Sequence, residues 1–307
     1  MHKDRLRSQQ GGKAVRQDEV DAVKNYLAAN FSTVRARDDY GWLNPALNLV
    51  DCVLSLNRPY ASMVLPRVQR LARRLPSLIS LGDLSDLIQT SGGGGPFLSE
   101  HLDYRDEQRG RTLEGVCAYF QRVSDAQPHA TEVARLHRWA ASVAPHDYLQ
   151  VRVPGFGPAG FQYFRMFCGA QTVKPDKYIV EKATELTGHW VSALGAVTLF
   201  EKAAALLNLP LREIDAEIWS AGSGGVVVYG GVPDRASGGQ TPTLSAKDFI
   251  RQTVAETGRF VMARGIAAGY KEVTLKTALS DLKNPKYCGS SGILVVKHTG
   301  DGVYVPA

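Results

Sequence analysis

Apolar residues recur at helical spacing through most of the first 220 residues, with short polar breaks between the runs. No segment there alternates apolar and polar positions convincingly enough to predict a strand. Ser91–Pro96 contains four consecutive glycines and is predicted to be a flexible surface loop, because it lacks the flanking signals of a phosphate-binding loop. The pattern predicts helices over 17–30, 45–56, 61–74, 81–89, 112–126, 131–144, 177–187, 198–207 and 211–220. We therefore expect a mainly α fold.

The pattern changes after Trp219, where glycine becomes frequent. Helical patterns return at 247–263 and 274–282, and two apolar segments at 292–297 and 302–305 predict a β-hairpin. This order resembles a winged helix, although a small partner-binding domain would give the same pattern. The expected organisation is a flexible N-terminus (1–16), a helical domain (17–222), a glycine-rich linker (223–243) and a small α+β domain (244–307).

The region 151–180 carries the strongest functional signal. Pro154-Gly155-Phe156-Gly157 predicts a tight turn, in which the glycines can take positive φ or let a phosphate approach the backbone. An apolar helical pattern follows, and the amides at the start of that helix would form an anion site. Two glycines on their own would be equally typical of a turn that merely joins packed helices.

Asp176 follows Pro175, which marks a break before a new helix, so we expect Asp176 at a helix N-cap. The backbone amides and the helix dipole would favour its ionised form there. An ordinary capping aspartate would occupy the same position. The glycine turn about twenty residues upstream favours a functional carboxylate instead.

Val153-Pro154-Gly155-Phe156-Gly157 followed by Lys174-Pro175-Asp176-Lys177-Tyr178 resembles the helix-hairpin-helix DNA glycosylases, the superfamily of endonuclease III and the alkyladenine glycosylases. Leu54-Ser55-Leu56-Asn57 is similar to their segment that fills the gap left by a flipped base. Leu211–Gly222 is similar to the helix that ends their catalytic fold, and the likeness spans roughly residues 40 to 222. The resemblance implies a two-lobed helical domain that binds DNA, most naturally double-stranded, and releases a base.

Two departures limit what the resemblance implies. Bifunctional relatives carry a lysine two residues past the second hairpin glycine, whereas Pro158 and then Ala159 stand here, which excludes Schiff-base chemistry at that position. Only Cys288 lies beyond the last catalytic helix, so no iron-sulfur cluster is expected. The resemblance also implies a sodium or potassium ion on the hairpin carbonyls of Val153 and Gly155. The spacing of the histidines predicts no side-chain metal site.

Composition adds weaker constraints. The net charge of +6 and the pI near 9.1 favour a polyanionic partner. The four cysteines form no CxxC pair, which predicts reduced core thiols. No apolar run approaches the ~20 residues that span a bilayer, and the polar N-terminus lacks a signal-peptide core. We expect a cytoplasmic protein without a membrane partner.

Breaking an N-glycosidic bond requires negative charge beneath an oxocarbenium-like sugar, a positioned water and a pocket for the rotated base. Asp176 is the candidate catalytic carboxylate. Asn57 either enters the duplex or caps a helix, Tyr60 is equally compatible with the core, and Lys177 either attacks the sugar or is simply solvated. Candidate DNA contacts are Val153, Gly155, Phe156, Gly157, Ala159, Gly160, Asn57 and Arg58. Candidate base-pocket residues are Tyr60, Gln162, Tyr163, Lys177 and Tyr178.

The sequence thus predicts a monofunctional DNA N-glycosylase that hydrolyses the bond to a damaged, modified or mismatched base in base excision. One alternative is a noncatalytic DNA-binding or regulatory protein on the same scaffold. A second is a glycosylase that acts on modified bases of foreign DNA.

Overall fold

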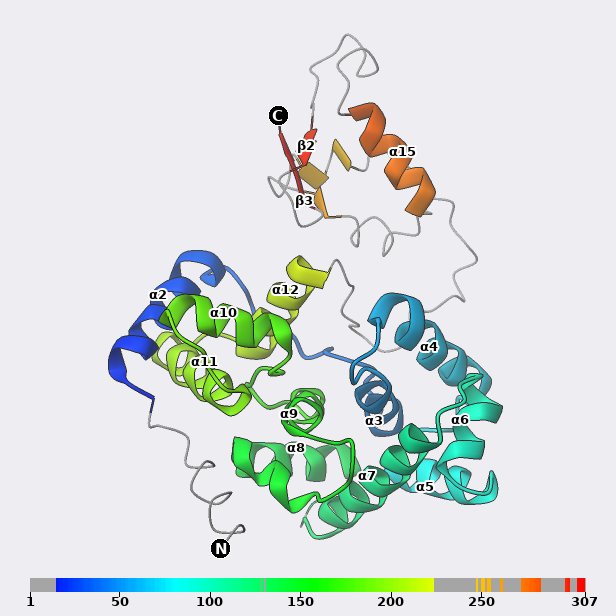
Figure 1. Cartoon of the computed structure of the whole chain (residues 1–307). Helices are drawn as coiled ribbons and strands as arrows, with labels where there is room; N and C mark the ends of the chain where they lie inside the picture. Colours follow the sequence, from blue (N-terminus) through cyan, green and yellow to red (C-terminus); the bar gives the residue numbers. More distant parts are fainter. Residues whose placement is uncertain are drawn as a thin grey trace, which may run out of the picture. The chain divides into compact units, whose positions relative to one another are not determined.

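The computed structural model describes residues 15–223 apart from 128 and 130, and, further on, residues 247, 250, 251, 253, 254, 260, 261, 272–282, 296–298 and 303–306. The described part of the chain is mainly helical (Figure 1), as the hydrophobic pattern predicted. The chain divides into two compact units, and the boundary falls after Ala216, within a helix. The predicted N-terminal segment lies mostly outside the described residues.

One group of helices in the first unit contains α2 (Gln17–Phe31), α10 (Lys177–Thr187) and α11 (Ala193–Leu207), which lie side by side in Figure 1. The buried residues of α2 are Val20, Val23 and Leu27, at helical spacing along a single face. Helix α12 (Leu211–Ser223) follows α11. This group therefore joins the N-terminal helix to elements far along the chain.

A second group surrounds a larger core, and α3 runs through it between α7 and α9. Every residue of α3 is buried, in keeping with a sequence that is apolar apart from Asn48 and Asp51. The helices are α3 (Pro45–Leu54), α4 (Leu65–Arg74), α5 (Leu81–Thr90), α6 (Gly94–Leu102), α7 (Glu107–Asp125), α8 (Glu132–Ser142) and α9 (Pro158–Phe167). Two short segments join them, the π-helical η1 (Tyr60–Val64) and the 3-10 helix η2 (Pro145–Gln150).

Several helices begin where a side chain caps free amides. Asn44 accepts from the Leu47 amide at the start of α3, and Asp106 accepts from the Arg109 amide at the start of α7. A cap of this kind typically contributes about 1 kcal/mol. The predicted helices 112–126 and 198–207 consequently begin earlier, at Glu107 and Ala193. The predicted helix 61–74 is divided into η1 and α4 near Pro66, which has no amide to donate.

The glycine run is not the flexible surface loop that the sequence predicted. Gly94 and Gly95 are buried and form the start of α6, where they pack against the backbone of Gly110 in α7. A Cβ atom at Gly94 or Gly110 would collide with main-chain atoms of the facing helix. The glycines therefore permit a close helix crossing, which sequence punctuation alone does not reveal.

The second unit contains α15 (Glu272–Leu282) and strands β1 (Phe260–Val261), β2 (Val296–His298) and β3 (Val303–Pro306). The strands pair antiparallel in the order β1-β3-β2, and β1 ends the predicted helix 247–263 early. Nearly all of the predicted linker and the turn of the predicted hairpin lie outside the described residues. None of the helices in the described residues has both the length and the apolar character needed to cross a bilayer.

Candidate active site

The glycine turn before α9 is a hydrogen-bonded β-turn. The Phe156 amide donates to the Val153 carbonyl at 3.1 Å, and Gly155 has φ of +83°. Pro154 followed by a residue with positive φ is typical of a type II turn, as the sequence indicated. The Thr112 hydroxyl donates to the Pro154 carbonyl at 2.8 Å and so attaches the turn to α7. A side chain at position 155 would strain the backbone and crowd Thr112.

Gly157 is the N-cap of α9, which begins at Pro158, and it faces open space. Pro158 has no amide, so the free amides of the first turn are those of Ala159 and Gly160. An open helix start of this kind favours an anion. The segment before the turn is the 3-10 helix η2 rather than an α-helix.

Two of the predicted DNA-contact residues lie in the core instead of on the surface. The Phe156 ring packs 5.9 Å from the ring of Phe120, measured between centroids, and is 5% exposed. Gly160 packs against α3, where its carbonyl accepts from the Cys52 thiol at 3.2 Å. These residues position the turn, and the Phe156 side chain is not presented to DNA.

Asp176 occupies the N-cap of α10, as the sequence predicted. Its Oδ1 atom accepts from the amides of Tyr178 at 2.9 Å and Ile179 at 3.4 Å. The Asp176 amide in turn donates to the Lys174 carbonyl at 2.7 Å, which tightens the loop before the helix. Within the described part of the chain, the second carboxylate oxygen, Oδ2, accepts no hydrogen bond. One oxygen thus holds the helix and the other remains available.

The electrostatic environment of Asp176 differs from the expectation for an N-cap. Burial raises the pKa of Asp176, whereas the Lys174 ammonium and the two amides lower it. Burial has the larger effect, so the amides do not by themselves keep the carboxylate at the ordinary pKa of an aspartate. Lys174 makes the largest opposing contribution. The ionisation of Asp176 therefore depends on a neighbouring cation.

The Lys174 side chain contacts the end of α3 and helix α9. Its Nζ atom donates to Ser55 Oγ, just past the end of α3, at 3.4 Å. The same ammonium lies 4.1 Å from the centroid of the Tyr163 ring on α9, within the range of a cation–π contact. Tyr163 and Ala159 are one turn apart on α9 and so share a face. The Lys174 ammonium therefore lies against the same face of α9 that carries Ala159, next to the glycine turn.

Asp215 of α12 holds the backbone of the Lys174-Pro175-Asp176 loop. Its Oδ1 accepts from the Lys174 amide at 2.9 Å, and its side chain is buried. Burial, followed by the negative charge of Asp176, raises the pKa of Asp215 well above its ordinary value. The ionisation of Asp176 thus disfavours that of Asp215, while the Lys174 charge favours both.

Asp51, in the middle of α3, is a second buried carboxylate close to Lys174. Its Oδ2 accepts from Trp42 Nε1 at 2.8 Å and from the Tyr60 hydroxyl at 2.6 Å. Its Oδ1 accepts from the Tyr163 hydroxyl at 3.3 Å. Burial raises the pKa of Asp51 to about 6, against the effect of these hydrogen bonds. This cluster fixes Tyr60 and Tyr163, two of the predicted base-pocket residues.

Asn57 and Arg58 lie on the surface beyond the end of α3. Ser55 is the C-cap of α3, and Asn57 is exposed with φ of +56°, so Asn57 is not the capping residue. Arg58 is partly committed, since it donates to the Tyr104 hydroxyl at 3.0 Å and to Asp106 Oδ2 at 3.3 Å. Ser55 places this loop next to the Lys174 ammonium.

The other pocket candidates point elsewhere. Gln162 is fully buried, and its Oε1 accepts from Arg165 Nη1 at 2.7 Å in the interior. Lys177 is exposed, with its ammonium 4.6 Å from the centroid of the Tyr178 ring. Gln162 is therefore a structural residue, and Lys177 with Tyr178 forms a surface pair.

Sequence reasoning did not identify Trp42, Asp51, Lys174 or Asp215 as members of this site. A signal existed for Asp51, because it is the only charged residue in the apolar segment that forms α3. A buried acid of this kind requires hydrogen-bond partners. No comparable signal marks Asp215, whose partner is a backbone amide far away in the sequence.

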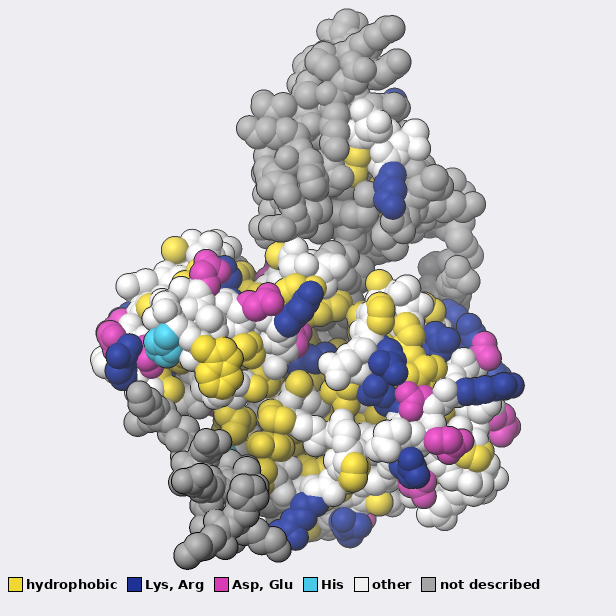
Figure 2. Space-filling view, viewed as in Figure 1, with side chains coloured by type: hydrophobic (Ala, Val, Ile, Leu, Met, Phe, Trp, Pro, Cys, Tyr) yellow, Lys and Arg dark blue, Asp and Glu magenta, His cyan; other side chains and the backbone are white. Residues whose placement is uncertain are grey.

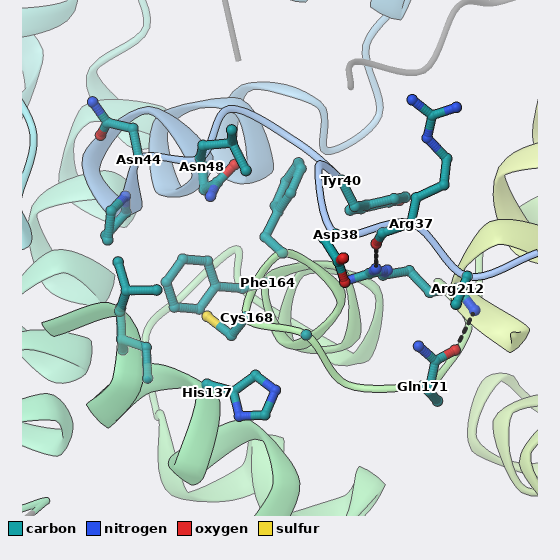
Figure 3. A pocket seen from close by; sticks show the side chains of 17 residues that line it. Arg37, Asp38, Tyr40, Asn44, Asn48, His137, Phe164, Cys168, Gln171 and Arg212 are labelled. Carbon is teal, nitrogen blue, oxygen red and sulfur yellow. Dashed lines mark hydrogen bonds between the residues drawn. The ribbon is translucent and has the colours of Figure 1, made fainter. Parts of the chain in front are cut away.

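A pocket of about 390 Å³ lies at the other end of α9 (Figure 3). Phe164 of α9 and Cys168 at its C-cap line it together with Asn44 and Asn48, and His137 contributes from α8. Asp176, Asp51 and Tyr163 are not among its lining residues. This pocket is therefore distinct from the carboxylate site.

The described residues contain no group of three or more His, Cys, Asp or Glu side chains that could hold a metal ion. At the hairpin, the Val153 carbonyl already accepts the Phe156 amide. The Gly155 carbonyl accepts no hydrogen bond within the described part of the chain. A monovalent ion on these two carbonyls stays a prediction.

Comparison with known proteins places the helical part of the chain. No curated protein and no solved structure matches it. Residues 19–223, from α2 to the end of α12, match the family described as Domain of unknown function (DUF8548). That match covers more than half of the chain. The chain therefore belongs to the DUF8548 family.

Proposed function

We propose that this protein is a DNA N-glycosylase that hydrolyses the bond between the sugar and a damaged, modified or mismatched base. The observation that carries the proposal is the half-bonded carboxylate of Asp176. One of its oxygens is held by the first amides of α10, and the other has no hydrogen-bond partner in the described part of the chain. A rigid carboxylate with a free oxygen suits the stabilisation of a sugar cation.

The chemistry would proceed through a sugar with oxocarbenium character. The free Oδ2 of Asp176 would face the developing positive charge and orient the attacking water. Lys174 supports this role, because its charge lowers the pKa of Asp176 against the effect of burial. Tyr163 and Tyr60, held by Asp51, would form part of the pocket wall for the rotated base.

The DNA backbone would bind at the glycine turn. The free amide of Ala159 at the start of α9 would receive a phosphate, and the open surface at Gly157 permits its approach. Asn57 is exposed in a left-handed conformation and would enter the duplex at the vacated position. Lys and Arg side chains also lie over α4, α6 and α7 on the face in Figure 2, with acidic side chains among them. The net charge of +6 favours the approach of a polyanion.

The C-terminal part is proposed to form a small α+β domain, winged-helix-like in its order of elements. The antiparallel pairing of β2 with β3 and the helix α15 support this arrangement. It would select a DNA site or a partner for the helical part.

The test is base release from duplexes that carry uracil, hypoxanthine, alkylated purines, oxidised bases or modified cytosines. Alkali cleaves the strand wherever a base has been lost. Wild type is compared with Asp176→Asn, which removes the charge while keeping a residue suited to an N-cap. We expect wild type to release one class of base and the variant to lose at least about 100-fold of that rate.

Unfolding curves and duplex binding control for the integrity of the variant. Equal binding by both proteins, with no base released by either, would support the noncatalytic DNA-binding alternative. Equal release by both proteins would remove Asp176 from the mechanism.

A further inference from the structure

Within the described residues, the Lys174 ammonium is not held in an ion pair, unlike those of two other lysines of this helical unit. Lys24 and Lys182 form ion pairs with Asp21 and Glu185, at 2.7 Å and 2.6 Å. Lys174 forms no ion pair within 4 Å in the described part of the chain. Its contacts are a long hydrogen bond to Ser55 and the face of an aromatic ring. Both contacts can be exchanged for a substrate without breaking a charge pair.

The position of Lys174 also relates it to the carboxylate that would face the sugar. Its charge lowers the pKa of Asp51, Asp176 and Asp215, so the ammonium lies within electrostatic reach of all three. Its backbone is fixed on both sides, by the Asp215 carboxylate and by the Asp176 amide. A flexible amine on a fixed backbone, beside a carboxylate with one free oxygen, is a suitable nucleophile for a carbonyl carbon.

We propose that Lys174 is a nucleophile that condenses with the aldehyde of an abasic site in DNA. The inference rests on the proposed function only for the source of this aldehyde, since base hydrolysis leaves a sugar whose ring-opened form carries a C1′ aldehyde. It adds a second reaction to base release. The amine for this reaction is Lys174, because residue 159 at the hairpin is an alanine.

The step balances without an oxidant or reductant. The Lys174 ammonium first loses a proton to water, and the neutral Nζ adds to C1′ to form a C–N bond. The former carbonyl oxygen takes up protons and leaves as water, which gives an iminium ion. Loss of a proton from C2′ then expels the 3′-phosphate with its electron pair and cleaves the strand. Asp176 Oδ2, which accepts no hydrogen bond in the described part of the chain, is the candidate to accept the C2′ proton.

Lys177 is the competing amine, and the structure favours Lys174 over it. The Lys177 side chain is exposed, and its ammonium lies over the neighbouring Tyr178 ring. Its charge has the smallest of the effects that lower the pKa of Asp176, whereas that of Lys174 has the largest. Lys174 alone contacts both the end of α3 and the α9 face below the hairpin.

The experiment uses the full chain and a duplex with a preformed abasic site, so no damaged base has to be known. Sodium cyanoborohydride reduces the iminium ion to a stable amine and leaves a protein–DNA adduct on a denaturing gel. The variants are Lys174→Arg, which keeps the positive charge but forms no imine with the aldehyde, Lys177→Arg for the competing amine, and Lys182→Arg as a matched control on α10. Mass spectrometry of the wild-type adduct locates the modified residue even if a variant fails to fold.

We expect an adduct with wild type, Lys177→Arg and Lys182→Arg, and its loss with Lys174→Arg although duplex binding persists. The adduct should map to Lys174. An adduct that persists in Lys174→Arg, an adduct mapped to another residue, or wild type that binds the duplex without forming one would overturn the assignment. Base release without an adduct would leave the glycosylase proposal standing, whereas an adduct without base release would leave only the amine chemistry.

Discussion

Asp51 and Asp176 are two carboxylates near one lysine, but their oxygens are used differently. Both oxygens of Asp51 accept side-chain hydrogen bonds, from Trp42, Tyr60 and Tyr163. Asp176 uses only Oδ1, for two backbone amides. Burial raises the pKa of both groups. Asp51 is fully buried and Asp176 only partly, but the difference that matters for chemistry is how fully each carboxylate is bonded.

The comparison separates a structural acid from a chemical one. A carboxylate whose two oxygens both accept hydrogen bonds joins the elements that contact it, because neither oxygen lacks a partner. A half-bonded carboxylate is held in place and still has an oxygen for a substrate. Asp51 therefore shapes the wall of the site, and Asp176 is the group able to act on a bound molecule.

The largest expected effect concerns stability. Asp51→Ala would leave three buried donors, those of Trp42, Tyr60 and Tyr163, without their acceptor, and should lower the free energy of unfolding by about 3–5 kcal/mol. Asp176→Asn should lower it by less than about 1 kcal/mol, because asparagine also caps helices. Urea unfolding followed by circular dichroism measures both. Similar losses of unfolding free energy in the two variants would contradict the assignment of Asp51 as the structural carboxylate.

The pH dependence of stability sharpens the comparison. Because the folded-state pKa of Asp51 is raised from 3.8 to about 6, its stabilising contribution is complete below about pH 4 and is lost as the pH rises through 6. Relative to Asp51→Asn, which does not titrate, wild type should lose about 3 kcal/mol between pH 4 and pH 7. Unfolding curves at several pH values test this. A constant difference would mean that folding does not raise the pKa of Asp51.

The two tyrosines on Asp51 should contribute unequally. The Tyr60 hydroxyl donates at 2.6 Å and the Tyr163 hydroxyl at 3.3 Å. Tyr60→Phe should therefore lower the free energy of unfolding by about 1.5 kcal/mol and Tyr163→Phe by about 0.5 kcal/mol. Thermal unfolding of both variants measures the difference. The reverse order would indicate that Tyr163, which also faces Lys174, is the more important support.

The smallest effect is a shift in the acid limb of base release. If ionised Asp176 is required, activity falls as the pH drops through its pKa, which burial has raised. Lys174→Gln removes the largest opposing charge, so the pKa of Asp176 should rise further and the limb should move to higher pH. Lys182→Gln is the control, because Lys182 pairs with Glu185 on the surface. An unmoved limb in Lys174→Gln would show that another group controls the titration.

Local features were predictable where one segment decided them. The positive φ of Gly155 and the N-cap position of Asp176 both follow from proline and glycine chemistry within a few residues. The glycine run was predicted wrongly, because Gly94 and Gly95 are needed for contact with Gly110 of another helix. Phe156 was expected at the DNA surface, but its apolar ring belongs to the core. Those outcomes depend on partners that a single segment does not contain.

The amino-acid sequence by itself determined the mainly helical character, most helix positions, the glycine turn and the capping aspartate, since periodicity and turn chemistry act over short distances. It also determined that position 159 carries no amine. Only the tertiary structure placed Lys174 over Tyr163, Asp215 behind the Asp176 loop, and Asp51 among its three donors. These contacts join residues far apart in the chain, and they form because buried polar groups must find partners wherever packing brings them together.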